Sequence, residues 1–445
     1  MLITLQKNTL LHILNSADTF AQRYHSAILW ISAAAYKLLL DWVYVTSASP
    51  LYEVSGLVMA PSAGKLLLGT VLYFFLFWML PKEEHSIGSL WLNLQFALTI
   101  APMLVFYGWA SQSTAYLCMV VVCAVLQCVL IRRPQTAKPV VFTGIRSYMT
   151  VAMGLAVIAT LVIPFLYNGF PGLKIFDLSY IYIWRRACEY PSGFGYLLNW
   201  TAMVIVPFFI LMAIHHKKYL AAMLGVLIQV LLFMESSSKF YLGLIVALIG
   251  IYIVSITGHT LKLAWIGFCA LTLFNAMTAR FYTGFTSIFG NIWAVRILFH
   301  PADNKFNYYD CYSVFPKVFF SDGLFGRLFS LTDPYTMSLG QVSYVFQGGE
   351  PRAVELNTGY LGDSYAQMGF LGMLLMSVLL VLIIRVLCLY STKKNFGVLA
   401  ALSMPFIFIL NDGALFTVLM TSGLMVAFIL IAIYMPERGI AKHGI

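Results

Sequence analysis

Residues 149–167 read MTVAMGLAVIATLVIPFLY, a run of nineteen residues without a charged side chain. An α-helix needs about 20 predominantly apolar residues to cross the hydrocarbon core of a bilayer, so this run predicts a membrane-spanning helix. Eleven further apolar runs occupy residues 27–46, 64–80, 88–108, 115–131, 194–213, 219–234, 240–257, 263–280, 366–388, 397–411 and 414–434. We therefore predict an all-α, polytopic membrane protein with about 12 transmembrane helices, forming one integral-membrane domain over residues 1–445.

The overall composition favours the same class. Of the 445 residues, 61% are hydrophobic and only 10% are charged, whereas soluble domains carry about 25% charged residues. This balance excludes a water-soluble domain and a disordered chain. The apolar residues lie in long runs and not in two-residue alternation, which excludes an outer-membrane barrel.

Positive charge is distributed unevenly among the connecting segments. The positive-inside rule places Lys and Arg in the loops that stay in the cytoplasm. The loops assigned to that side carry Arg132, Arg133, Lys138, Arg146, Lys217, Lys218, Lys393 and Lys394. This orientation makes both termini cytoplasmic. The same rule accounts for the formal net charge of +10 without a nucleic-acid partner.

Two segments on the opposite, outward face are longer than simple connections. Residues 168–193 form a medium loop, and residues 281–365 form a loop of about 85 residues, which is far above the usual connection length. The long loop is dense in aromatic residues, a composition that argues against disorder. We expect it to fold into short helices on the outer mouth of the bundle and to form the active face.

The outward loops are rich in arginine, against the direction of the positive-inside rule. The arginines of the outward face are Arg185, Arg186, Arg296, Arg327 and Arg352 in the loops and Arg280 at the end of the ninth span. A planar guanidinium donates two parallel hydrogen bonds and therefore suits a phosphate or diphosphate group. Surface ion pairs on a folded loop are the alternative explanation for any one of these residues.

Several familiar chemistries leave no pattern in the sequence. No Cys/His spacing is typical of a zinc site, the outward carboxylates include no D-x-D pair, and no nucleotide-binding loop or hydrolase elbow occurs. We therefore expect neither a metal nor a cofactor. Cys188 and Cys311 both lie in outward loops, where an oxidising compartment would permit a disulfide between them.

Two further charged positions lie in or beside the predicted spans. Lys37 and Asp41 share one face of the first span at i, i+4 spacing. Because charge inside a membrane is costly, a functional pair and a self-neutralised pair are both open. Asp412, in the sequence Asn411–Asp412–Gly413, is explained by a turn between two spans.

The most informative motif ends the long loop. Residues 355–372 read ELNTGYLGDSYAQMGFLG. Gly359 and Gly362 permit a tight backbone, Asp363 can cap the following helix, and Gly369 allows close helix packing.

This segment resembles the loop-to-helix junction of the Wzy-type polymerases of O-antigen and capsule repeat units. In that family an Asn and a glycine-punctuated aromatic segment precede a helix that opens on a Gly-x-x-Gly step. The number of spans and the two outward loops with their arginines are also similar. The resemblance implies a GT-C-like fold in the bacterial inner membrane. The implied reaction is inverting, metal-independent glycosyl transfer between undecaprenyl-diphosphate-linked glycans on the periplasmic face.

The resemblance also implies roles for individual residues. Asp363 or Glu355 would be the base, with Asp322 as a further candidate. Arg280 and Arg296 would stabilise the departing diphosphate. The substrate would be bound by Arg185, Arg186, Arg327, Arg352, Asn357, Tyr360 and Tyr365. A chain-length regulator and other polysaccharide-assembly proteins are the partners that the family implies.

Two alternatives remain open at the level of sequence. The related O-antigen ligases, which transfer glycan to lipid A-core, typically carry a His next to the Asn; here the matching neighbours are Glu355 and Leu356, which favours a polymerase. An Arg-x10-Gly spacing of some polymerases is absent. A flippase for lipid-linked glycans would also have about twelve helices, but its cations should lie within the spans.

Overall fold

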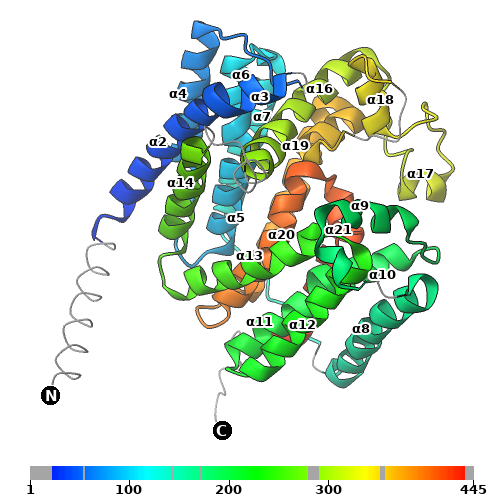
Figure 1. Cartoon of the computed structure of the whole chain (residues 1–445). Coiled ribbons are helices and arrows are strands. Elements are labelled where there is room, and N and C mark those ends of the chain that lie inside the picture. Colours follow the sequence, from blue (N-terminus) through cyan, green and yellow to red (C-terminus); the bar gives the residue numbers. More distant parts are fainter. Residues whose placement is uncertain are drawn as a thin grey trace.

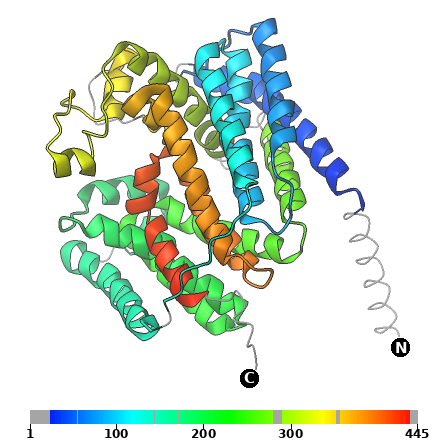
Figure 2. The ribbon, with the colours of Figure 1, turned by 180° about the vertical axis from the view of Figure 1, so that it is seen from behind.

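The computed structural model is an α-helical bundle (Figures 1 and 2) that describes residues 23–53, 56–142, 144–169, 172–278, 290–350 and 356–435. Within these residues 78% of the structure is helix and no strand occurs, so the fold is all-α. Nine helices of the described ranges are long and apolar enough to cross a membrane, and three shorter apolar helices coincide with further expected spans. The prediction of a polytopic membrane protein is confirmed at this level.

The first half of the bundle combines the N-terminal helices with one later helix. It contains α2 (His25–Val43), η1 (Tyr44–Ala48), α3 (Ser49–Tyr52), α4 (Ala63–Met79), α5 (Ile87–Gln95), η3 (Phe96–Ile100), α6 (Ala101–Trp109), α7 (Thr114–Ile131) and α14 (Thr260–Thr278). Helix α2 packs along α14, and α4 packs along α6. The segment α5–η3–α6 is buried along its whole length and forms the centre of this half.

The second half lies beside the first in both views (Figures 1 and 2). It contains α8 (Arg146–Asn168), α10 (Phe194–Trp200), η5 (Thr201–Ile205), α11 (Val206–His215), α12 (Tyr219–Ser236), α13 (Lys239–Ile256), α21 (Leu415–Met420) and α22 (Leu424–Tyr434). Helices α19 (Gly359–Tyr390) and α20 (Phe396–Asp412) join the halves, because α19 packs on α7 while α20 packs on α13.

Four helices widen into π-helical turns, and each widening has a local cause. The turns η1, η3, η5 and η7 (Asn291–Phe299) are followed within two residues by Pro50, Pro102, Pro207 and Pro301, respectively. Proline lacks an N–H group and its ring clashes with the carbonyl four residues earlier. A local shift to i→i+5 hydrogen bonding relieves that clash without ending the helix.

The outward loops fold into short helices. The medium loop contains η4 (Leu173–Phe176) and α9 (Leu178–Ala187), and the long loop contains η7, α16 (His300–Val314), α17 (Leu324–Phe329) and α18 (Leu339–Phe346). Helix α16 packs on α19 and α18 packs on α16. Helices α16, α17 and α18 lie at one end of the bundle, here called the long-loop end (Figure 1). Helix α2 begins and α22 ends at the opposite end, here called the termini end.

The junction into α19 differs from the sequence prediction. The helix begins at Gly359, seven residues before the predicted span, so Asp363 lies inside the helix instead of capping it. The helix is interrupted at Met368 and Gly369, where Gly369 has φ 62° and ψ −146°. This earlier start and the interruption both follow from contacts with the long loop.

Backbone groups of the long loop bond to the helix at this interruption. The Val318 N–H donates to the Ala366 carbonyl at 3.2 Å and the Phe319 N–H donates to the Gln367 carbonyl at 3.0 Å. These carbonyls have lost their partners in the next turn of the helix, and an unpaired buried carbonyl is costly. The loop therefore stabilises the first two turns of α19 as a separate helical segment.

Two smaller predictions are tested by the fold. The Lys37 Nζ lies 2.5 Å from the Asp41 carboxylate, and the Trp109 indole N–H also donates to Asp41, at 2.9 Å. The self-neutralised pair is therefore present and joins α2 to α6. Cys188 and Cys311 are both free thiols, so the permitted disulfide is not formed.

Candidate functional site

Asn411, the penultimate residue of α20, connects four segments at the long-loop end. Its Nδ2 donates to the Ile297 carbonyl at 2.7 Å, and its Oδ1 accepts from the Thr99 hydroxyl at 2.9 Å and from Lys305 Nζ at 3.2 Å. Gly359 also packs here, since a Cβ at that position would lie 2.3 Å from the Asn411 carbonyl oxygen. One amide side chain thus fixes the ends of η3, η7, α16 and α20 around the start of α19.

Lys305 is the most buried cation of the long loop. It is fully buried in α16, and its ammonium donates to the carbonyl oxygens of Pro301 at 2.9 Å and Asn411 at 2.7 Å. Burial lowers the pKa of Lys305, and the nearby Asp412 carboxylate opposes that shift. The two carbonyl acceptors favour the charged ammonium, which lies near Asp412.

Arg296 lies next to this group and faces outward. It is exposed on η7 and makes no ion pair with any residue that the structure describes. The pKa of the half-buried His300 is lowered, first by burial and then by the Arg296 charge. The Arg296 charge also interacts electrostatically with the Asp412 carboxylate. We call Arg296, His300, Lys305, Asn411 and Asp412 the Asn411 cluster; it combines an exposed guanidinium with a buried ammonium.

A buried carboxylate lies one turn along α16 from this cluster. Asp303 is 4% exposed, and the loop residue Gly56 covers it so closely that an added Cβ would lie 2.6 Å from Oδ2. Burial raises the pKa of Asp303 to about 8, a hydrogen bond from Asn307 opposes the shift, and Asp310 adds to it. Asp303 is therefore suited to hold a proton near neutral pH.

A second group, here called the Gln367 cluster, lies at the interruption of α19. The Gln367 Nε2 donates to Asp322 at 3.1 Å, and its Oε1 accepts from the Phe320 N–H at 2.6 Å. Asp363, one turn earlier on α19, also contacts Gln367 and lies within electrostatic range of Asp322. Asp322 is exposed and Asp363 is half-buried. Two neighbouring carboxylates in unlike surroundings are the arrangement that acid–base chemistry requires.

Aromatic rings form a surface beside the Gln367 cluster. Tyr365 lies 5.1 Å from Tyr309 and 5.4 Å from Phe370, measured between ring centroids, and Tyr309 stacks on Tyr116 at 5.0 Å. The Lys317 ammonium lies 3.7 Å from the centroid of Tyr365. Phe370 is 39% exposed and Tyr309 is half-buried, so part of this stack is accessible. Flat rings of this kind can pack against the apolar face of a sugar.

The remaining predicted residues have different surroundings. Tyr360 is buried, and its hydroxyl accepts hydrogen bonds from Gln95 and from Gln127, the latter at 2.9 Å. It serves the interior of the bundle and does not face a substrate surface. Asn357 is exposed at the start of α19 and Arg327 is exposed on α17. Arg280, Arg352 and Glu355 lie outside the described residues.

The two arginines of the medium loop lie in the other half of the bundle. Arg185 and Arg186 are both exposed on α9, and Arg185 acts electrostatically on Tyr241. No hydrogen bond or ion pair within the described ranges joins them to the Asn411 cluster or to the Gln367 cluster.

The contacts of Lys305, Asn411 and Gln367, and of Lys317 beside Tyr365, were not predicted from the sequence. Gln367 lies in the motif of residues 355–372 and Asn411 in the expected turn, but each meets its partner only because distant segments fold together. The sequence offered one signal for Asn411 and Gln367. Each is an amide in or near an apolar run, where its side chain needs hydrogen-bond partners within the protein.

The described residues contain no group of three or more side chains arranged to hold a metal ion. Comparisons of the whole chain with protein-family models, with curated proteins and with solved structures gave no match.

Proposed function

We propose that this protein is a glycosyltransferase that polymerises undecaprenyl-diphosphate-linked repeat units at the outward face of the bacterial inner membrane. The proposal includes twelve spans in a GT-C-like arrangement, with both termini cytoplasmic. The observation that supports it is the position of the motif: its Asp363 lies beside Asp322, and its Gly359 packs on Asn411 of the cluster that contains Arg296. Arg296 lies beside Asp412, while Asp322 and Asp363 both contact Gln367.

The proposed reaction needs an anion-binding group and a base. A hydroxyl of the acceptor glycan attacks the anomeric carbon of the donor, a new C–O bond forms, and the bond to the lipid diphosphate breaks. Arg296 would stabilise the negative charge that develops on the departing diphosphate, and the buried Lys305 would add to the local positive potential. Arg280 would act with Arg296.

Asp363 would accept the proton of the attacking hydroxyl, because it is half-buried and held by Gln367 beside Asp322. Glu355 is the other candidate for the base. Tyr365, with Phe370 and Tyr309, would pack against sugar rings. Arg185, Arg186, Arg327, Arg352 and Asn357 would bind more distant parts of the glycan or a chain-length regulator.

The test supplies purified protein in detergent with lipid-linked repeat units and neither nucleotide sugar nor ATP. We expect longer glycans on a gel, because the donor is already activated and detergent removes any need for transport. Arg296→Ala and Arg296→Lys should each slow chain growth by about 10- to 100-fold, since a lost charge-assisted hydrogen bond costs roughly 1.5–3 kcal/mol.

The matched control is Arg133→Lys, an exposed arginine at the termini end, which should grow chains at the wild-type rate. Folded wild-type protein that leaves authentic substrate unchanged would remove the proposal. Full activity of Arg296→Lys would remove only the assigned role of the guanidinium.

A further inference from the structure

A buried polar contact ties the start of α19 to the first half of the bundle. The Tyr360 hydroxyl accepts hydrogen bonds from Gln95 of α5 and from Gln127 of α7, the latter at 2.9 Å. The Gln95 amide also donates to Gln127, at 3.3 Å. Each of the three residues is at most 2% exposed. We call Tyr360, Gln95 and Gln127 the Tyr360 cluster.

The two glutamines of this cluster lie in apolar surroundings. Gln95 and Gln127 both belong to helical segments that are long and apolar enough to cross a membrane. Because water is absent from the bilayer core, an amide there depends on partners within the protein. A shift of one helix against the others would leave these polar groups unpaired, which is costly. The cluster therefore favours one arrangement of α5, α7 and α19 over its neighbours.

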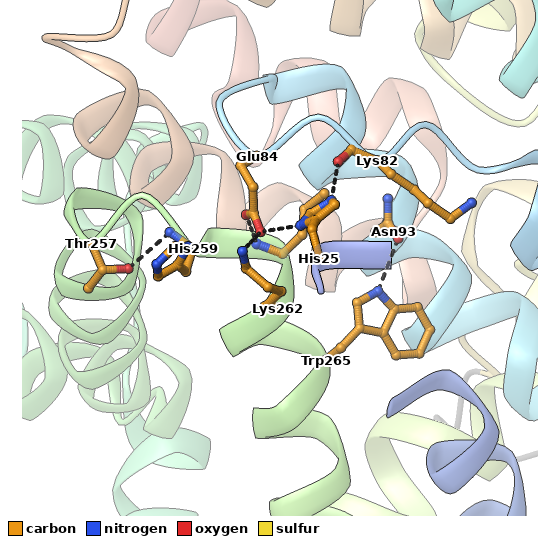
Figure 3. Close-up of polar contacts among 9 residues, drawn as sticks. His25, Lys82, Glu84, Asn93, Thr257, His259, Lys262 and Trp265 are labelled. Atoms are coloured by element: carbon orange, nitrogen blue, oxygen red, sulfur yellow. Dashed lines mark hydrogen bonds and ion pairs between the residues drawn. The ribbon is translucent and has the colours of Figure 1, made fainter. Parts of the chain in front are cut away.

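The helix that carries Gln95 is itself fixed in the first half. Asn93, two residues earlier in α5, accepts a hydrogen bond from the Trp265 indole N–H of α14 at 3.0 Å. Figure 3 shows this contact together with the ion pair between Glu84 and Lys262, which joins the loop before α5 to the start of α14 at 3.4 Å. Gln95 therefore presents its amide from a firmly held support.

A second contact lies close to the Tyr360 cluster. Thr99, four residues after Gln95, donates to the Asn411 side chain at 2.9 Å. Gly359, which directly precedes Tyr360, packs on the Asn411 carbonyl. The start of α19 is thus connected to the segment α5–η3 twice, directly through Tyr360 and indirectly through Asn411.

The part of α19 that the Tyr360 cluster holds is short and separate. The helix is interrupted at residues 368–369, so the rest of α19 does not fix the rotation of residues 359–367 about the helix axis. Asp363 follows Tyr360 by three residues and Gln367 follows it by seven. At 3.6 residues per turn, both lie within about 60° of Tyr360 around the axis. The position of the Tyr360 hydroxyl therefore sets the direction in which Asp363 projects.

We propose that Tyr360, Gln95 and Gln127 are positioning residues that hold Asp363 in its reactive orientation. This inference rests on the function proposed above, in which Asp363 accepts the proton of the attacking hydroxyl. The three residues are buried and act on the reaction only through Asp363. Such an effect can be large, because a displacement of about 1 Å caused by a distant mutation can lower a rate by about 100-fold.

The first experiment compares two tyrosines of the same helix. Tyr360→Phe removes the hydroxyl and keeps the ring. The matched control is Tyr390→Phe, because Tyr390 is also buried and its hydroxyl donates to the Val140 carbonyl at 2.8 Å, beyond the interruption. We expect Tyr360→Phe to lower kcat for chain growth by about 10- to 100-fold with little change in KM. Tyr390→Phe should keep both values.

An apolar triple variant separates positioning from stability. Tyr360→Phe/Gln95→Met/Gln127→Met leaves no polar group of the cluster without a partner, and replacing all partners of a buried contact by apolar groups of similar shape can be nearly neutral for stability. We expect this variant to melt close to the wild type while its kcat stays as low as that of Tyr360→Phe. Recovery of wild-type kcat together with the melting temperature would overturn the proposal, because the cluster would then only stabilise the fold.

Hydrogen exchange followed by mass spectrometry tests the cluster without substrate. In detergent, residues 359–367 should exchange faster in Tyr360→Phe and in the triple variant than in the wild type, while Tyr390→Phe should leave their exchange unchanged. Unchanged exchange in all three variants would overturn the proposal even if the protein polymerises glycan. Faster exchange in a protein that makes no polymer would overturn the role in the reaction together with the proposed function, and would leave only the anchoring of the segment.

Discussion

Asn411 is the residue on which the long-loop end depends. Its amide and carbonyl bind Thr99, Ile297 and Lys305, three residues from three different segments. The sequence prediction of a turn at Asn411–Asp412–Gly413 agrees with the end of α20 at Asp412. It could not include Lys305, because 106 residues separate the two partners along the chain. Local turn chemistry is readable from sequence, and a contact of this separation is not.

Asp303 makes the stability of the protein dependent on pH. Because burial raises the pKa of Asp303 from 3.8 to about 8, the folded state holds its proton more tightly than the unfolded chain does. The free energy of unfolding should therefore fall as the pH rises from about 4 to about 8, and should change little with this group above that range.

Asp303→Asn removes the titrating group while keeping a hydrogen-bonding side chain. We expect the melting temperature of the variant to exceed that of the wild type by an amount that grows from pH 4 to pH 8. Thermal unfolding in detergent, followed by tryptophan fluorescence, measures the difference. Glu189→Gln, at an exposed carboxylate, is the control. An equal difference at all pH values would contradict the assignment.

At the scale of single elements, α19 shows that a helix can begin before the apolar run that predicts its span. Hydropathy alone places the start of the span near residue 366, but the helix begins at Gly359. Hydropathy does not report the N–H groups of residues 318–320. These groups donate hydrogen bonds to Ala366 and Gln367 and so stabilise the first turns of α19. The π-helical turns are a different case, since the prolines that cause them are visible in the sequence.

Gly369 has a backbone conformation in α19 that a residue with a side chain would strain. Its φ of 62° and ψ of −146° lie in a region that is essentially restricted to glycine. An added Cβ would meet nothing closer than the Lys317 side chain at 3.6 Å, so Gly369→Ala tests backbone strain without a steric clash. We expect it to lower stability by about 1–3 kcal/mol.

The matched control is Gly250→Ala in α13, a helical glycine with open space around it. That variant should be neutral or slightly stabilising, because alanine is the better helix former. Thermal melting of both variants in the same detergent compares them. If Gly369→Ala melts with Gly250→Ala, residues 368–369 do not form the interruption described above.

At the scale of the whole molecule, the apolar runs predicted the class of fold and the approximate position of most helices. They could not predict which helices pack together, because lipid-facing and buried helices have similar hydropathy. Helix α8 has only 11% of its apolar window buried, whereas the segment from Ile87 to Trp109 is wholly buried, yet the hydropathy of α8 is higher. The arrangement into two halves therefore depends on helix–helix contacts that hydropathy does not predict.

The proposed orientation can be tested independently of activity. Reporter enzymes fused after Arg133 and after Lys394 should be active on the cytoplasmic side, and one fused after the exposed Ser330 should be active on the periplasmic side. We expect this sidedness because Lys and Arg are concentrated in the loops at the termini end, and such loops stay in the cytoplasm. A cytoplasmic signal at Ser330 would place the long-loop end on the wrong side for lipid-linked donors.

The hydrogen bonds between residues 318–319 and α19 also have a consequence for biosynthesis. The donors precede the carbonyls of Ala366 and Gln367 in the chain, so they leave the ribosome first and, in the proposed orientation, would cross the membrane before the helix inserts. The helix thus inserts with partners for its interrupted turn already in place. Shortening the loop upstream of α19 should therefore impair insertion of the nascent helix as well as chemistry at the mouth.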